Sequence, residues 1–334
     1  MARLFLTADG VSATMLTQAG RADLVVALQP RFVWGPPASD AELSSFLAPR
    51  TTQPKSGHWL DHCAFGDFAT IGGRRHGLLE LVERCHSIEL WMETPPNDQL
   101  VLIWLLDYLS DHPQLATKIV LRHIDVPLFN PKPVGLSNGI FVGVNLCSDH
   151  LAIGSRAWRA YRSPTPQPWY ALLDEKTDLL PQLRRTVFKL LDELPRLQSG
   201  LGITELRMLD LLDRGRGAMH ALINRVVYLE PIDTRTPFNY YEAADLLEAL
   251  AFAPRPAVSR VDPGLRTRER VNLRLQHELH QSSRPVITPL GLDILDGRDD
   301  YSRHNPVHRW WGGTKLTNGN LWRWDPIGNV LIAP

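Results

Sequence analysis

Three polar side chains that could form a ligand site stand where an apolar segment of the N-terminal half ends. Residues 88–92 (IELWM) have the composition of a buried β-strand, and Glu93 follows them directly. Asp98 and Gln99 come after two prolines and open an apolar segment of helical length. Two neighbouring carboxylates can bind hydrogen-bond donors of a ligand or act as a general acid and base. An acid at a helix start is also favoured by the helix dipole alone, which is the structural alternative for Asp98.

Two other loops carry candidate site residues after strand-like segments. Asp9 and Gly10 follow the first such segment, and Gly35 lies beyond the second. Trp34, beside Gly35, is expected to form an apolar wall of the same site. In an open α/β sheet, ligands bind at the carboxyl ends of parallel strands. We therefore predict one ligand site that includes these residues together with those after the third strand: Asp9, Gly10, Trp34, Gly35, Glu93, Asp98 and Gln99.

Motifs for cofactors and metals are weak or absent in the sequence. The single Gly10 is no G-x-G-x-x-G fingerprint, and neither a P-loop nor a G-x-S-x-G elbow is found. His58, Asp61 and His62 have helical spacing but lack the Glu of H-E-x-x-H. We expect no cofactor and no metal, and the sequence assigns no catalytic residue.

Alternating short strands and helices over the first 130 residues predict the fold class. This order is typical of an α/β domain whose parallel sheet has helices on both faces. Apolar residues then recur at intervals of three and four, which predicts helices. We predict an α/β ligand-binding domain at 1–135, a helical domain at 136–253, and an Arg-rich linker plus a winged-helix-like β-hairpin module at 254–334. Asn318-Gly319 is the strongest hairpin signal.

Composition limits the partners and the compartment. The chain has 334 residues, with 36 basic and 36 acidic side chains, so net charge favours no polyanionic partner. No apolar stretch approaches the roughly 20 residues of a membrane span. Three cysteines without C-x-x-C spacing indicate free thiols in a reducing compartment. We expect a cytoplasmic protein that does not contact a membrane.

The C-terminal third offers nucleic acid as a different partner. Six arginines fall between residues 254 and 274, and four tryptophans lie in the last 25 residues. Arginines can contact phosphates, and tryptophans can stack on bases. The tryptophans are also expected as cross-strand pairs of an Asn-Gly hairpin. Because no basic recognition helix is evident, we rank nucleic acid below a small molecule.

Several segments resemble a bacterial family catalogued as domain of unknown function 1835, whose members often end in a second domain numbered 3658. The resemblance runs in order along nearly the whole chain. It implies this architecture, and Glu93, Asp98, Gln99 and Gly35 match its pattern. The segments that carry it are LWMETPPNDQLVLIWLLDYL, SDHLAIGSRAWRAYRSPTPQPWYALL, GLGITELRMLDLL and ITPLGLDIL with HRWWGGTKLTNGNLWRWD.

The chain departs from this family at polar positions. The family carries Asn-Gly-Asp-Ser after the first strand, where this chain has Ala-Asp-Gly-Val at 8–11. It carries a His and an Asp after the strand-end Glu, where this chain has Thr94 and Pro95. These departures favour a protein that binds a less charged small molecule, with a regulatory role as one form of this. The alternative is a hydrolase or transferase that uses Glu93 and Asp98 as acid and base.

Overall fold

A computed structural model describes residues 2–50, 58–61, 63–124, 142–231, 234–266 and 272–334. The chain divides into two compact units. The first contains residues 1–32, 36–163 and 171–186, and the second contains 33–35, 164–170 and 187–334. The domain boundaries predicted at 135 and 253 remain predictions. No helix among the described residues is long and apolar enough to cross a membrane.

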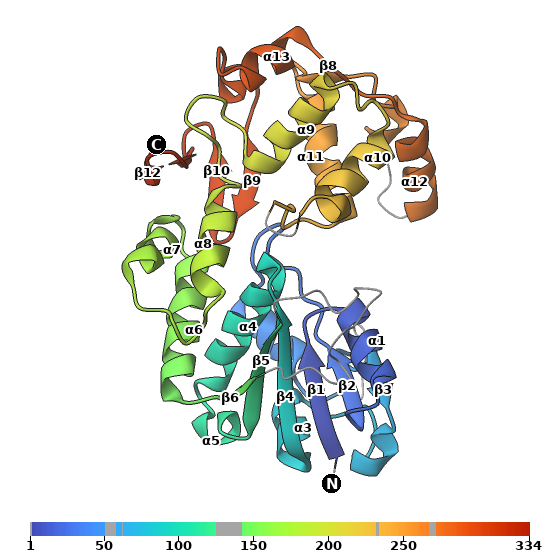
Figure 1. Ribbon diagram of the computed structural model, residues 1–334, viewed down its shortest axis with the longest axis vertical. Coiled ribbons are helices and arrows are strands. Elements are labelled where there is room, and N and C mark those ends of the chain that lie inside the picture. The colour runs from blue at the N-terminus through green and yellow to red at the C-terminus, as the bar shows by residue number, and fades with distance from the viewer. Residues whose placement is uncertain (1, 51–57, 62, 125–141, 232–233, 267–271) are drawn as a thin grey trace. The chain divides into compact units, whose positions relative to one another are not determined.

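The first unit contains a six-stranded sheet whose central strands are parallel (Figure 1). The predicted α/β character is therefore confirmed, but the sheet is mixed, because both edge strands are antiparallel to their neighbours. The strands follow one another across the sheet in the order β3 (Ala64–Gly66), β2 (Leu24–Ala27), β1 (Ala2–Thr7), β4 (Cys85–Glu93), β5 (Ile119–Ile124) and β6 (Gly143–Asn145).

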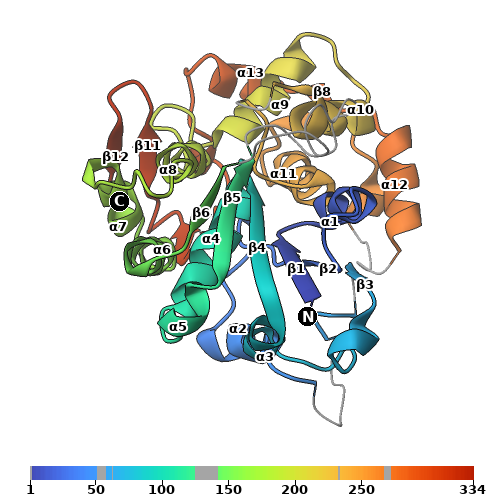
Figure 2. The ribbon, with the colours of Figure 1, turned by 60° about the horizontal axis from the view of Figure 1, so that its bottom comes forward.

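Helices of the first unit connect and cover these strands (Figure 2). Helix α1 (Gly10–Gln18) packs with Ala13 and Leu16 on the apolar face formed by Phe5, Val25 and Trp91. Helix α4 contacts β4 and packs along α6. Helices α2, α3 and α5 are shorter, and α3 ends at Arg84, directly before β4 begins at Cys85. The bounds of these helices and of α4 and α6 are α2 (Asp40–Phe46), α3 (Leu78–Arg84), α4 (Pro96–Leu109), α5 (Pro113–Ala116) and α6 (Ser148–Tyr161).

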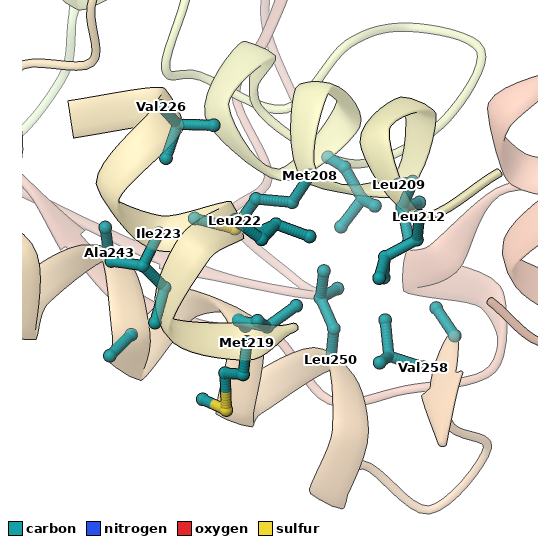
Figure 3. Packing of buried hydrophobic residues seen from close by; sticks show 14 of the residues in the cluster. Met208, Leu209, Leu212, Met219, Leu222, Ile223, Val226, Ala243, Leu250 and Val258 are labelled. Carbon is teal, nitrogen blue, oxygen red and sulfur yellow. The ribbon is translucent and has the colours of Figure 1, made fainter. Parts of the chain in front are cut away.

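The second unit is mainly helical in its middle, as predicted, and is built around one apolar cluster (Figure 3). Met208 and Leu209 of α9 meet Leu222 of α10 and Leu250 of α11 there, and all four are buried. Helix α8 spans the boundary between the units, as does the short helix α7 (Gln167–Ala171). The helices are α8 (Leu183–Leu191), α9 (Ile203–Asp213), α10 (Met219–Asn224), α11 (Tyr240–Phe252), α12 (Leu273–Ser282) and α13 (Pro289–Leu295).

Short antiparallel strand pairs complete the second unit, but not where the Asn-Gly signal predicted them. The hairpin formed by the strands His308–Trp311 and Thr314–Thr317 turns at Gly312-Gly313, and Gly312 has a positive φ of 50°. Asn318-Gly319 forms a tight turn closed by a single bridge between Thr317 and Asn320. The predicted cross-strand tryptophan pairs are therefore wrong, since Trp310 lies opposite Lys315. The pairs are β7 (Val258–Ser259) with β8 (Val286–Ile287), β9 (His308–Trp311) with β10 (Thr314–Thr317), and β11 (Arg323–Asp325) with β12 (Val330–Ile332).

Candidate functional site

The candidate site lies where the chain leaves two neighbouring central strands in opposite directions across the sheet. From β1 the chain passes through α1 to β2, on one side, while from β4 it passes through α4 to β5, on the other. Right-handed crossovers then put α1 and α4 on opposite faces. The carboxyl ends of such strands form the topological switch point, where doubly wound sheets bind ligands. Asp9 follows β1, and Glu93 ends β4.

Asp9 caps helix α1 from within this switch point. Its Oδ1 accepts hydrogen bonds from the backbone N–H groups of Val11, at 2.8 Å, and Ser12, at 3.0 Å. The helix begins at Gly10, directly after Asp9. A carboxylate at an N-cap satisfies backbone donors and is stabilised by the helix dipole. The cap accounts for the position of Asp9 and uses only its Oδ1 atom.

The side chain of Ser12 links the two strand ends. Its hydroxyl lies 2.5 Å from Asp9 Oδ2 and also makes a short contact with Glu93 Oε1. Ser12 and Glu93 are both buried. One hydroxyl proton cannot be donated to two carboxylates at the same time. The arrangement therefore concentrates acceptor oxygens at the switch point.

Asp98 brings a third carboxyl group to the same place. It lies in the first turn of α4, which begins at Pro96, and its side chain is buried. Burial raises the pKa of Asp98 well above its ordinary value, and the charges of Asp9 and Glu93 raise it further, against the opposing charge of Arg31. A buried carboxyl group with this bias holds its proton and can donate it.

Two amide side chains at the start of α4 fix the loops around the carboxyl groups. Gln99 Nε2 donates to the backbone oxygen of Glu93 at 2.6 Å. Asn97 accepts from the N–H of Phe32 at 2.9 Å and donates to the oxygen of Pro30 at 3.0 Å, so it holds the loop that follows β2. Gln99 thus positions the end of β4, and its predicted ligand contact remains a prediction.

Gly10 is required for space rather than for an unusual backbone angle. A Cβ atom built on Gly10 would lie 2.7 Å from Cys63 Sγ and 3.0 Å from Gln29 Nε2. Neither distance leaves room for a methyl group without a shift of the neighbour. Gln29 itself has a positive φ of 57°, an uncommon conformation that holds it at the end of β2. Gly10, Gln29 and Cys63 thus lie close together beside Asp9.

Thr7 adds a polar group that the sequence did not single out. It pairs in register with Ala27 and Trp91, which both face α1, so its side chain lies on that face too. Glu93 faces the same way, because its partner Ile124 belongs to the α1 cluster. Thr7 Oγ1 is fully buried and has no hydrogen-bond partner among the described residues. Such groups are uncommon in folded proteins.

The structure brings together only some of the predicted residues. Asp9, Glu93 and Asp98 interact with one another, and Gly10 and Gln99 adjoin them. Trp34 and Gly35 belong to the second unit, where the Trp34 ring packs edge-on against Phe238 at 5.5 Å. Their predicted place in the site remains a prediction.

The residues predicted as candidates for a metal site or for nucleic-acid contact lie partly outside the described residues. Asp61 pairs with Arg50 and accepts the N–H of His58, while His62 lies outside the described residues. Within the described part of the chain, no group of three or more His, Cys, Asp or Glu side chains is placed to hold a metal ion. Arg268 and Arg270 also lie outside the described residues.

The tryptophans and arginines of the C-terminal tail are largely engaged inside the second unit. Trp324 is buried, and its indole N–H donates to Asp192. Arg309 bonds to Glu205, and Arg323 bonds to Asp300. These contacts explain the tail as a structural closure. Trp310 is the one of the four tail tryptophans whose side chain is exposed.

A pocket of about 310 Å³ lies elsewhere in the first unit, along α6. Asp149, Arg156, Lys176 and Asp178 line it with apolar neighbours. It is open to solvent and carries charges of both signs. The switch point has the more specific chemistry, because its acidic groups are buried and interact directly.

Comparisons with known proteins do not add a family to this geometry. A scan against models of protein families finds none that matches the chain, and a search of curated proteins finds no relative.

Proposed function

We propose that the chain binds a small molecule at the switch point between β1 and β4, and that the ligand presents hydrogen-bond donors. The observation that carries the proposal is the convergence of Asp9, Ser12, Glu93 and Asp98 at this edge of the sheet. Helix N-termini ordinarily favour anions, but here Asp9 already caps α1 and Asp98 already occupies the first turn of α4. A further anion would be repelled, whereas an amine or a hydroxyl-rich neutral ligand would be attracted.

A thermal-shift screen of amines, polyols and nucleosides tests this proposal. Compounds that raise the melting temperature of the wild-type protein should fail to do so with Glu93→Gln, because the amide cannot replace the carboxylate charge. Glu89→Gln is the matched control, since Glu89 lies on the same strand and face but pairs with Arg122. If hits stabilise the Glu93→Gln protein as well as wild type, the site is misplaced. If no donor-bearing compound stabilises wild type, the ligand class is wrong.

A second candidate function is favoured by the raised pKa of Asp98. A protonated, buried carboxyl group beside two further carboxylates is the arrangement of a general acid with a general base. This supports a hydrolase or transferase that uses Asp98 as acid and Glu93 as base. Activity on chromogenic esters or glycosides should then fall as pH rises through the raised pKa of Asp98. Asp98→Asn should abolish turnover while the protein stays folded, and a variant with unchanged turnover would contradict this role.

Three wider expectations belong to the same proposal. The resemblance to the family of domain of unknown function 1835 supports a bacterial origin and this architecture. Helix α13 followed by the β9–β10 hairpin supports a winged-helix-like C-terminal module. All three cysteines are free, which supports a reducing, cytoplasmic location. Nucleic acid binding ranks lower, because Arg309 and Arg323 are engaged in ion pairs.

A further inference from the structure

A cysteine and a histidine are paired at the start of helix α6, in the first unit. Cys147 is the N-cap of this 14-residue helix, and His150 occupies its first turn. The Sγ atom of Cys147 lies 3.0 Å from Nδ1 of His150. The thiol is exposed, whereas the imidazole is buried. A reagent in solution can therefore reach the sulfur, while the ring beside it is held in place.

The contacts of the imidazole define its protonation. Nδ1 accepts the backbone N–H of Cys147 at 3.3 Å, so the neutral ring carries its proton on Nε2. Nε2 is buried and has no hydrogen-bond partner among the described residues. Burial lowers the pKa of His150, against the opposing charge of Asp149, so the ring is neutral at pH 7. The unprotonated Nδ1 therefore faces both the backbone N–H and the thiol of Cys147.

The sulfur of Cys147 lies at the N-terminus of α6, on a residue that is exposed to solvent. Cys85 provides the contrast within the same unit. It is buried, and burial raises the pKa of its thiol to about 11, so it stays protonated and unreactive at neutral pH.

We propose that Cys147 is a nucleophilic thiol, activated by His150, and the site at which this chain is modified by soft carbon electrophiles. In the step, the proton of the thiol passes to Nδ1 of His150 as the sulfur attacks the electrophilic carbon. A C–S bond forms, the bond from that carbon to its leaving group breaks, and the leaving group departs with the electron pair. No oxidant or reductant is needed. The site is separate from the switch point and does not depend on its ligand.

Alkylation by iodoacetamide at pH 7, followed by digestion and mass spectrometry, tests the proposal at each cysteine of the wild-type protein. Iodide is then the leaving group. Cys147 should react about tenfold faster than N-acetylcysteine under the same conditions, as activated thiols do. Cys85 should remain unmodified. A rate at Cys147 no higher than that of N-acetylcysteine overturns the proposal.

His150→Gln separates activation from simple exposure. Glutamine at this position can still accept the backbone N–H of Cys147, so the start of α6 is preserved. It cannot take up a proton, and the rate at Cys147 should fall to that of N-acetylcysteine across pH 6 to 9, with the same pH profile. An unchanged rate in a variant with wild-type circular dichroism contradicts the role of His150.

Discussion

Two buried acidic clusters, one in each unit, differ in what surrounds them. In the second unit, burial raises the pKa of Glu193 to about 7, but the hydrogen bond from the Thr204 hydroxyl and the charge of Arg309 are the next largest effects, and both oppose it. In the first unit, burial of Asp98 is followed by the charges of Asp9 and Glu93, which add to it. The rise in pKa caused by burial is thus opposed by the neighbours of Glu193 and increased by the neighbours of Asp98.

The contrast indicates different purposes for the two clusters. Thr204 Oγ1 donates to Glu193 at 2.6 Å, and Arg309 joins Glu205 at 2.8 Å and the Glu193 backbone at 2.9 Å. Donors supplied by the chain itself make this cluster part of the fold. At the switch point, by contrast, acceptor oxygens of Asp9 and Glu93 come together from the ends of β1 and β4. Burial alone does not identify a binding site, whereas the sign of the neighbouring charges distinguishes these two.

Removal of Arg309, the cation of the acidic cluster in the second unit, should have the largest effect on the unfolding free energy. Arg309→Ala leaves the buried carboxylate of Glu205 without its partner, and loss of a buried partner destabilises a protein by about 3–5 kcal/mol. Urea unfolding at pH 7 measures the change. Arg298→Ala is the control, because that arginine is exposed and its ion pairs should contribute little. Equal losses in both variants would remove the distinction between compensated and surface charges.

The next largest effect should be a change of the unfolding free energy with pH that is caused by Glu193. Its folded pKa of about 7 lies above the ordinary value of 4.5, so the folded state holds the proton more tightly. Stability is then highest below pH 4.5 for this group and falls as pH rises to about 7, by about 1.4 kcal/mol per unit or about 3 kcal/mol in total. Glu193→Gln should flatten the unfolding free energy over this range by that amount. An unchanged slope would show that Glu193 is not buried as described.

A smaller effect is expected from the cap of α1. Asp9→Ala removes the acceptor for two backbone N–H groups and should destabilise the protein by about 1 kcal/mol, whereas Asp9→Asn keeps the cap. Urea unfolding of both variants measures the difference. An equal loss for Asn and for Ala would mean that the charge of Asp9, and not its cap, holds the fold.

The smallest effect on the unfolding free energy should come from Glu93. Glu93→Gln relieves repulsion with Asp9 and Asp98, so the unfolding free energy should change by less than about 1 kcal/mol, in either direction. The same urea measurement applies. A loss as large as that of Arg309→Ala would make the switch-point cluster structural and would weaken the proposed ligand site.

The sequence predicted the elements that carry strong local signals. The apolar runs predicted β1, β2 and β4, and Pro95-Pro96 marked the start of α4, because proline is accepted in the first turn of a helix. The edge strands β3 and β6 were missed, since each has three residues and no alternation to detect. The preferred turn residues also misled, because Gly312-Gly313 competes with Asn318-Gly319 in the same tail.

Within the candidate site, the sequence could predict the residues at strand ends, but not those that reach the site through tertiary packing. Asp9 and Glu93 could be placed at one edge because parallel strands align their carboxyl ends. Ser12 could not, since its contact with Glu93 spans 81 residues and depends on the tilt of α1. Thr7 gave no signal either, because a buried threonine inside an apolar strand resembles any β-branched residue. His150 went unnoticed beside Cys147 because a three-residue separation acquires meaning only once the helix start is known.

The direct junction of α3 and β4 makes the chain unequally tolerant of changes in length. Helix α3 ends at Arg84 and β4 begins at Cys85, so no loop residue is available to absorb an insertion there. The pairing of β1 with β4 is already irregular at Ala2–Arg3, where one extra residue of β4 is accommodated. Any residue added between Ser87 and Glu93 would turn the strand end over and carry Glu93 to the face opposite α1. The seam between α3 and β4 is therefore the place in this sheet where an added residue is least tolerated.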